Sequence, residues 1–404
     1  MAAINRREFG GVVLALGTGA GIVTGAGGLD ETLRASVMRR KIPAAVAMAA
    51  TAERTAYTGA FGKRDSSATA DLAPDSIFQI ASMTKAVTSV AAMQLVERGM
   101  LKLDEPVSRR LPKLDGLQVL GGFDKNTGDP VLRPVSKPVT LRRLLTHTAG
   151  FGYDTWDGNL LRYGAAGASG VSPLLFEPGT RWEYGTNLDW TGRLVEAVAG
   201  QTLETYFESN ILAPLGMRDT GFSVPAEKFD RLVSVYQRQS DGSLKENPRT
   251  PPAPPKTFNG GGGLYSTAGD YVRFMQMILR RGRSSDGQPI LRAETVDMMT
   301  SNQIGELSAG KMKSVRPERS SDVDFHPGFS DKFGFGFLIN TVAYEGGRSA
   351  GSLAWGGLEN TFFWIDPRRG VCAVLLMQFL PFCDTEAMGL LHDFERAVYA
   401  ALPA

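Results

Sequence analysis

Ile80-Ala81-Ser82-Met83-Thr84-Lys85 opens the stretch that decides the fold, an apolar run that continues to Gly99. Apolar side chains recur at helical spacing and no Gly or Pro interrupts them, which predicts a buried helix that begins at Ser82. Lys85 lies one turn along on the same face, so its amine and the Ser82 hydroxyl can reach each other. A serine hydroxyl becomes a nucleophile when a nearby base takes its proton, and a buried, uncharged lysine amine can be that base.

The S-x-x-K pattern occurs a second time, at Ser308-Ala309-Gly310-Lys311. The surrounding residues are Gly, Lys, Arg, Ser and Asp without apolar periodicity, which is typical of a solvated loop where a lysine keeps its charge. Only the copy at Ser82 has the helix that the chemistry requires.

The composition is that of a soluble globular protein. The chain has 404 residues, of which 43% are hydrophobic and 21% charged, and this length is sufficient for two lobes. Its 44 Lys and Arg balance 42 Asp and Glu, and no basic block indicates nucleic acid. Cys372 and Cys383 are predicted to be free thiols, and His147, His326 and His392 match no metal-binding spacing. We expect no metal and no other cofactor.

Residues 1–28 have a separate interpretation. Asn5-Arg6-Arg7-Glu8-Phe9, followed by a stretch rich in Gly, Ala and Val, resembles a twin-arginine export signal, although Thr24-Gly25-Ala26 is a mediocre cleavage site. The alternative is a frayed N-terminus. The protein is therefore expected in the periplasm, through such a signal, or in the cytoplasm. No other stretch reaches the roughly 18 consecutive apolar residues needed to span a membrane.

The order of the predicted elements indicates an α+β fold. Helices are expected at 29–40, 267–279 and 385–401, and strands at 44–50, 55–61, 334–341, 351–355, 361–365 and 371–379. Between them, residues 104–255 show helical patterns with few strand signals and end at Pro251-Pro252-Ala253-Pro254-Pro255. We therefore predict an antiparallel sheet flanked by helices and built from residues 29–103 and 256–404, with residues 104–255 as an inserted helical domain.

Three further stretches bear on chemistry. Tyr184 stands at a junction between a loop and a helix, where it either packs or, as a phenolate favoured by a lysine ammonium, shuttles the serine proton. Gly356 and Gly357 end a strand, where they either permit close approach of an extended substrate or mark a bend in the sheet. His147, in Leu144-Leu145-Thr146-His147-Thr148-Ala149-Gly150, has no acidic partner at a recognisable spacing, which favours a structural histidine.

Together these stretches resemble the serine β-lactamase and penicillin-binding-protein superfamily. The resemblance rests on five motifs in order and covers nearly the whole chain after residue 29: Ser82-Met83-Thr84-Lys85, 144–150, 178–187, 261–267 and Trp355-Gly356-Gly357. The nearest match is the esterase branch similar to class C β-lactamases, often called family VIII esterases.

The resemblance implies an acyl-enzyme route on carboxylic esters. Ser82 would attack the ester carbonyl, and Lys85 and Tyr184 would act together as general base and then acid. The backbone N–H groups of Ser82 and Leu358 would form the oxyanion hole, where one donor is typically worth about 3 kcal/mol of barrier. The substrate-binding residues would be Trp355, Gly356, Gly357 and Asn187.

Two departures from the family pattern bear on the substrate. Trp355-Gly356-Gly357 replaces K-T-G, so the cation that would bind the carboxylate of a β-lactam or peptide is missing, and an indole favours an apolar, uncharged substrate. Thr186 stands where Y-x-N has its asparagine, and Asn187 follows one place later. Both changes favour small carboxylic esters over antibiotics.

Other functions stay open at this point. Gly347-Arg348-Ser349-Ala350-Gly351 satisfies G-x-S-x-G, with Asp366 and His392 following, but a strand-like segment rather than a helix comes after the serine. The further alternatives are an amide hydrolase of the β-lactamase or D-Ala-D-Ala carboxypeptidase type, an acyltransferase, and a non-catalytic module that binds peptides or cell-wall fragments. The oligomeric state is open as well.

Overall fold

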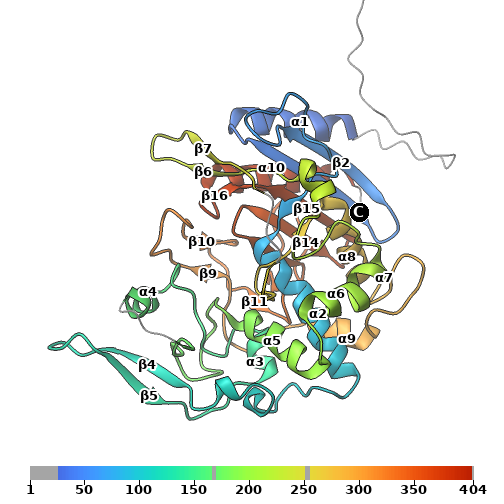
Figure 1. Ribbon diagram of the computed structural model, residues 1–404. Coiled ribbons are helices and arrows are strands. Elements are labelled where there is room, and N and C mark those ends of the chain that lie inside the picture. The colour runs from blue at the N-terminus through green and yellow to red at the C-terminus, as the bar shows by residue number, and fades with distance from the viewer. Residues whose placement is uncertain (1–25, 166–169, 251–254, 403–404) are drawn as a thin grey trace, which may run out of the picture.

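A computed structural model describes residues 26–165, 170–250 and 255–402 (Figure 1). The predicted export segment lies outside the described residues up to position 25, and so does the proline-rich crossing at 251–254. The first described element, α1 (Ala26–Arg39), leads directly into the first strand of the main sheet.

A seven-stranded antiparallel sheet forms the centre of the molecule. Its spatial order is β11-β12-β13-β14-β15-β1-β2, so strands from the two ends of the chain meet where β1 pairs with β15. There Ala45 lies opposite Met377 and Ala49 opposite Ala373. The predicted α+β class and the construction of one sheet from both chain ends are thus confirmed. The strands are β1 (Ala44–Thr51), β2 (Thr55–Gly62), β11 (Lys332–Phe333), β12 (Leu338–Ile339), β13 (Leu353–Gly357), β14 (Thr361–Asp366) and β15 (Val371–Met377).

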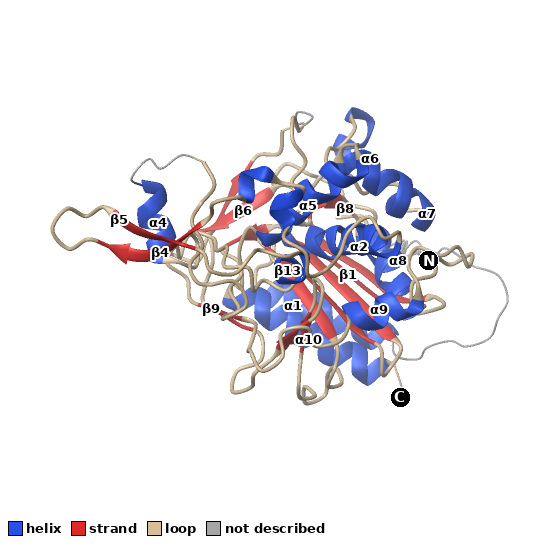
Figure 2. Ribbon diagram, turned by 90° about the horizontal axis from the view of Figure 1, so that it is seen from below, coloured by secondary structure: helices blue, strands red, loops and turns tan. Residues whose placement is uncertain are grey.

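Helices cover both faces of this sheet (Figure 2). On one face α1 packs against α10 (Thr385–Ala401), where Ser36 donates a hydrogen bond of 2.7 Å to Asp393. On the other face α8 (Ala268–Leu279) lies on β1 and β15 and is followed by α9 (Ala293–Met299). The side chain of Thr267 accepts a hydrogen bond from the Asp270 amide, so the predicted cap of α8 is present.

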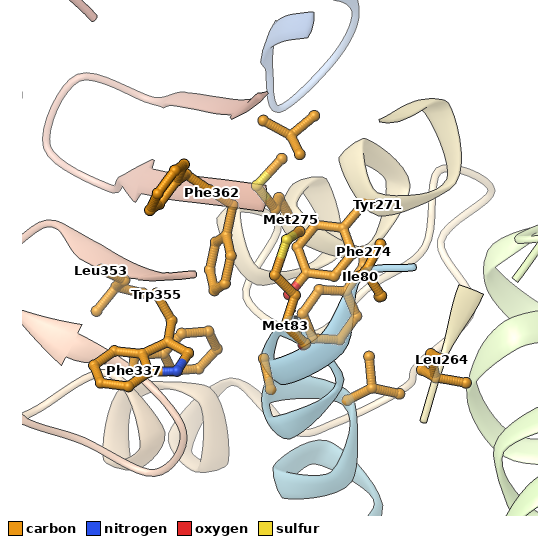
Figure 3. Close-up of a cluster of buried hydrophobic side chains, with 14 of the residues drawn as sticks. Ile80, Met83, Leu264, Tyr271, Phe274, Met275, Phe337, Leu353, Trp355 and Phe362 are labelled. Atoms are coloured by element: carbon orange, nitrogen blue, oxygen red, sulfur yellow. Dashed lines mark hydrogen bonds between the residues drawn. The ribbon is translucent and has the colours of Figure 1, made fainter. Parts of the chain in front are cut away.

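The helix that follows Ser82 lies at the centre of the hydrophobic core. α2 (Thr84–Glu97) is buried from Thr84 to Leu95, as its largely apolar sequence predicts. Figure 3 shows Met83, just before α2, beside Tyr271 and Phe274 of α8. The Tyr271 hydroxyl donates a hydrogen bond of 3.0 Å to the Met83 carbonyl, which fixes the start of α2.

Two strand predictions need correction. Residues 334–341 are not one strand: they begin with the turn that joins β11 to β12, where Gly336 adopts φ +92° and Gly334 donates to the Phe337 carbonyl, and only β12 follows. Residues 371–379 divide at Gln378 into β15 and β16 (Phe379–Leu380). The Gln378 side chain leaves the sheet to accept a hydrogen bond of 2.7 Å from the Gln79 amide.

The middle region contains more strands than its sequence pattern predicts. It holds the helices α3 (Leu141–Leu145), α4 (Gly158–Ala165), α5 (Asn187–Ala199), α6 (Leu203–Phe207) and α7 (Ala213–Leu215). It also holds two hairpins, β4 (Gln118–Phe123) with β5 (Pro130–Pro134) and β6 (Val235–Arg238) with β7 (Leu244–Asn247). β6 also pairs in parallel with β16, which ties the middle region to the C-terminal part of the chain.

Short elements complete the described fold. Two small antiparallel pairs join β3 (Phe78–Gln79) to β8 (Tyr265–Ser266) and β9 (Lys311–Met312) to β10 (Val323–Asp324). Tight 3₁₀ turns occupy Ala81–Met83, Val107–Arg109, Pro112–Leu114 and Ala226–Arg231, and a wider π-helical segment occupies Glu208–Leu212.

Candidate active site

Ser82 lies in the tight turn that leads into α2, at the wall of a cavity. The preceding residue, Ala81, adopts φ +41°, a conformation uncommon for a residue with a side chain. The end of β13 packs directly on this turn, because a Cβ atom at Gly357 would overlap the Ile80 carbonyl oxygen. Ser82 is therefore held between α2 and the edge of β13.

The Lys85 amine lies next to the Ser82 hydroxyl, as the helical spacing predicts. Lys85 is 1% exposed, and its Nζ atom lies 3.2 Å from Ser82 Oγ. Nζ also donates hydrogen bonds to the Gly261 carbonyl at 2.6 Å and to Tyr153 Oη at 3.2 Å. An uncharged amine has two N–H groups and one lone pair, so with these two bonds made the lone pair is available to the serine proton.

The tyrosine hydroxyl that contacts Lys85 belongs to Tyr153, a residue that the sequence interpretation did not include. Tyr153 Oη in turn donates a hydrogen bond of 3.2 Å to Asp189 Oδ2, on α5. Burial, and then the neighbouring Asp189, hold the pKa of Tyr153 well above its usual value. Burial also raises the pKa of Asp189, against the opposing effect of Lys85. Tyr153 therefore keeps its proton and orients the lysine amine.

Tyr184 approaches Lys85 with its ring rather than its hydroxyl. Lys85 Nζ lies 4.8 Å from the centroid of the Tyr184 ring, and Tyr184 Oη accepts a hydrogen bond of 3.4 Å from Trp355 Nε1. Tyr184 also lines the same cavity as Ser82.

The cavity beside Ser82 has a volume of about 290 Å³. Much of its wall is aromatic, from Tyr153, Trp156, Tyr184, Trp355 and Phe382. Gly356 and Leu358 also line it, so two predicted substrate-binding residues, Trp355 and Gly356, and both predicted oxyanion-hole residues, Ser82 and Leu358, are brought together. The roles of all four stay predictions.

Two residues predicted to bind substrate do not line this cavity. Asn187 is fully buried, and its amide donates to His147 Nδ1 at 3.0 Å and to the Phe151 carbonyl at 3.3 Å, so this side chain serves the protein's own packing. Gly357 lies against the Ile80 backbone, so the close approach that it permits is within the chain. The structure therefore does not bring these two residues to the cavity wall, and their predicted contact with substrate stays a prediction.

His147 has the structural position that its sequence context predicts. Its side chain is buried against the rings of Tyr184 and Phe333, at centroid distances of 4.9 and 5.4 Å. Burial, with the nearby Lys85, lowers the pKa of His147 well below its usual value, so the imidazole is neutral.

The competing motifs do not assemble a site in the structure. Ser349 lies in a turn between β12 and β13, where its amide donates to Asp366 at 2.8 Å, and no helix follows it. His392 lies on α10 and lines another cavity. Lys311 of the second S-x-x-K is 58% exposed in its side chain and pairs with Asp324 at 3.2 Å.

Besides Tyr153 and Asp189, sequence reasoning missed three charged residues of the cavity, Asp154, Arg319 and Glu359. Arg319 comes from a loop after β9, and Glu359 directly follows Leu358. Arg319 supplies a cation although the K-T-G lysine is missing, and no local pattern around it marks this role. Tyr153 lies only three residues beyond the stretch that ends at Gly150, so extending that stretch would have included it.

Neither a metal site nor a membrane span is evident in the part of the chain that the structure describes. Within residues 26–165, 170–250 and 255–402, no three His, Cys, Asp or Glu side chains gather as metal ligands could. Over the same ranges, no helix combines the length and apolar character needed to cross a bilayer. Cys372 and Cys383 are both buried and free.

Known proteins resemble this chain over nearly its full length. The Beta-lactamase family model matches residues 29–392. Monacolin J acid methylbutanoyltransferase from Aspergillus terreus is 33% identical over 398 residues, which cover 92% of this chain and 95% of that protein. Lovastatin esterase from Penicillium rubens is 30% identical over 407 residues, which cover 92% and 98%.

Solved structures agree with these sequence matches. A mutant of simvastatin synthase from Aspergillus terreus superposes with a TM-score of 0.80 at 34% identity, over 92% of this chain and 96% of that chain. The matched region contains Ser82, Lys85 and the cavity that Ser82 lines. This chain therefore belongs to the Beta-lactamase family, within the superfamily of serine β-lactamases and penicillin-binding proteins.

Proposed function

We propose that this protein is a serine enzyme that cleaves small carboxylic esters through an acyl-enzyme on Ser82. The observation that carries the proposal is the buried Lys85 amine, 3.2 Å from Ser82 Oγ. Its two hydrogen bonds to Gly261 and Tyr153 direct its lone pair to the serine proton.

The reaction has two steps. Lys85 takes the Ser82 proton while Oγ bonds to the ester carbonyl carbon, and the alcohol leaves with a proton delivered through Tyr184. Tyr153, held by Asp189, keeps the lysine amine in place. An incoming hydroxyl then gives its proton back to this system as it takes the acyl group, and Ser82 is regenerated. The N–H groups of Ser82 and Leu358 stabilise the carbonyl oxygen in both steps.

The second candidate function differs only in the incoming hydroxyl. With water the enzyme is an esterase, and with an alcohol it is an acyltransferase. Monacolin J acid methylbutanoyltransferase and lovastatin esterase, both at least 30% identical to this chain, carry these two activities in their names. Transfer therefore stands beside hydrolysis as a proposed outcome of the same acyl-enzyme.

Turnover of p-nitrophenyl butyrate tests this proposal in three proteins: the wild type, Ser82→Ala and Ser349→Ala. We expect Ser82→Ala to lose at least a thousandfold in kcat and Ser349→Ala to keep nearly all activity. Adding an alcohol in rising concentration then separates the two outcomes, since a butyryl ester of that alcohol forms only if it intercepts the acyl-enzyme. Loss of activity in Ser349→Ala alone would move the site to the G-x-S-x-G motif. A folded wild type that turns over neither esters nor β-lactams would favour a binding module.

A further inference from the structure

Two charged side chains on the wall of the catalytic cavity have buried atoms without a partner. Nε of Arg319 and Oε2 of Glu359 are both shielded from solvent and make no hydrogen bond to any residue that the structure describes. Among the Arg, Lys, Asp and Glu side chains that the structure describes, these two have a buried atom without a hydrogen-bond partner. The neighbouring Arg316 differs, because it pairs with Asp154 at 2.9 Å and Glu318 at 3.0 Å.

Hydrogen bonds hold the backbone segments that carry both side chains. The Phe382 amide donates a hydrogen bond of 2.9 Å to the Arg319 carbonyl, and Trp156 Nε1 donates one of 3.2 Å to Ser320 Oγ. On the other side, Asn360 holds the turn that carries Glu359 by donating to the Phe379 and Pro381 carbonyls, each at 2.8 Å. The backbone at Arg319 and at Glu359 is therefore anchored on the cavity wall.

We propose that Arg319 binds a free carboxylate of the substrate, so that the enzyme prefers esters or acyl acceptors that carry a carboxylate away from the reacting ester. This inference rests on the proposed acyl-enzyme at Ser82. A guanidinium with a buried, unpaired N–H is costly until a ligand satisfies it, and its planar fork matches a carboxylate. The aromatic walls of the cavity would enclose the apolar part of the same molecule.

Glu359 is compatible with a carboxylate at this place. Burial raises its pKa to about 7, with Arg319 acting in the opposite direction, so near neutral pH Glu359 can take up a proton. The protonated carboxyl can then donate a hydrogen bond to the substrate carboxylate instead of repelling it.

Two pairs of matched compounds test the proposal in the kinetics. The first pair, p-nitrophenyl hemiglutarate and p-nitrophenyl butyrate, places the carboxylate on the acyl side. The second pair, 4-hydroxybutyrate and 4-hydroxybutyramide as acceptors of a butyryl group, places it on the alcohol side. In at least one pair, we expect Arg319→Gln to lower the preference for the charged compound about 10–100-fold, the usual range for hydrogen bonds to a charged group. Arg319→Lys should keep part of this preference, and Arg316→Gln should keep all of it.

A binding measurement keeps the inference separate from the proposed chemistry. In Ser82→Ala, which cannot form the acyl-enzyme, monomethyl glutarate and dimethyl glutarate are compared by quenching of tryptophan fluorescence, because Trp156 and Trp355 line the cavity. The charged compound should bind more tightly, and Arg319→Gln should abolish the difference. If it does so while the wild type turns over neither p-nitrophenyl butyrate nor p-nitrophenyl hemiglutarate, the proposed function fails and the carboxylate site stands.

Two results would overturn the carboxylate site. One is turnover of p-nitrophenyl butyrate by the wild type with no preference for a carboxylate in either pair or in binding. The other is that Arg319→Gln and Glu359→Gln each lose the same fraction of activity with charged and with neutral compounds. The two side chains would then act only on the structure of the cavity wall.

Discussion

At the scale of single residues, the two tyrosines beside Lys85 have different positions and should have different roles. Tyr153 donates to Asp189 and accepts from Lys85, so its hydroxyl is fully used within the protein. Tyr184 Oη accepts one bond from Trp355, and Tyr184 lines the cavity beside Ser82. We therefore expect Tyr153 to position the amine and Tyr184 to exchange a proton with the substrate.

Replacing each tyrosine by phenylalanine should separate these roles. We expect Tyr184→Phe to lower kcat for p-nitrophenyl butyrate by about 10²–10⁴-fold, the usual contribution of a general acid or base. Tyr153→Phe removes a positioning contact and should cost only about tenfold in kcat, because Lys85 loses one hydrogen bond. Steady-state kinetics from pH 6 to pH 10 measure both effects. A larger loss in Tyr153→Phe than in Tyr184→Phe would exchange the two assignments.

Glu359 should make the stability of the protein depend on pH. Burial raises its pKa from 4.5 to about 7, so the folded chain holds this proton more tightly than the unfolded chain. The stabilisation from the neutral form is complete below about pH 4.5 and is lost as the pH rises through 7. Glu359→Gln cannot titrate, so its Tm relative to the wild type should rise by roughly a few degrees between pH 5 and pH 8. Burial also raises the pKa of Glu183 to about 7, but both proteins retain Glu183, so its contribution cancels in the comparison. A constant difference in Tm over this range would contradict the assignment.

At the scale of elements, the contact between the end of β13 and the turn before Ser82 sets the geometry of the site. Gly357→Ala would place a methyl group against the Ile80 carbonyl and Thr361 Oγ1. The strand and the turn must then separate, which should cost about 1–3 kcal/mol of unfolding free energy. It should also lower kcat more than it raises KM, because Leu358 and Ser82 move apart.

Gly269→Ala is the matched control for Gly357→Ala. Gly269 lies in α8, and the space that an added methyl group would occupy is open, with Thr267 Oγ1 at 4.0 Å as the nearest atom. A helix interior favours alanine over glycine by up to about 1 kcal/mol, so this change should stabilise the protein and leave kcat unaltered. Urea unfolding and esterase kinetics on both variants check the prediction, and a fully active Gly357→Ala would show that the close contact has no part in catalysis.

At the scale of the whole molecule, the sequence predicted what depends on local pattern. The periodicity after Ser82 identified α2, and short runs of mainly apolar residues bounded by turns identified β1, β2, β14 and β15. The β6–β7 hairpin and its link to β16 were missed, because short, half-polar strands carry little pattern and depend on partners far along the chain. Arg319 and Asp189 were missed for the same reason, since only the tertiary fold brings them to the cavity of Ser82.

One ion pair joins the middle region to the last helix and should affect the stability of the whole molecule. Arg238 of β6 donates to Asp384 at 2.7 Å, and Asp384 also caps α10 by accepting from the Glu386 and Ala387 amides. Both side chains of the pair are largely buried, so removing the negative charge leaves a guanidinium without its partner. Asp384→Asn keeps an acceptor for the cap and should lower the free energy of unfolding by about 3 kcal/mol. Asp384→Ala loses the cap as well and should cost about 1 kcal/mol more.

Urea unfolding followed by both tryptophan fluorescence and far-ultraviolet circular dichroism measures these losses. The two probes should give coincident unfolding curves in the wild type. If the ion pair couples the two regions, the curves should separate in the variants. Coincident curves in all three proteins would show that the regions are held together elsewhere, at the contact of α2 with α5.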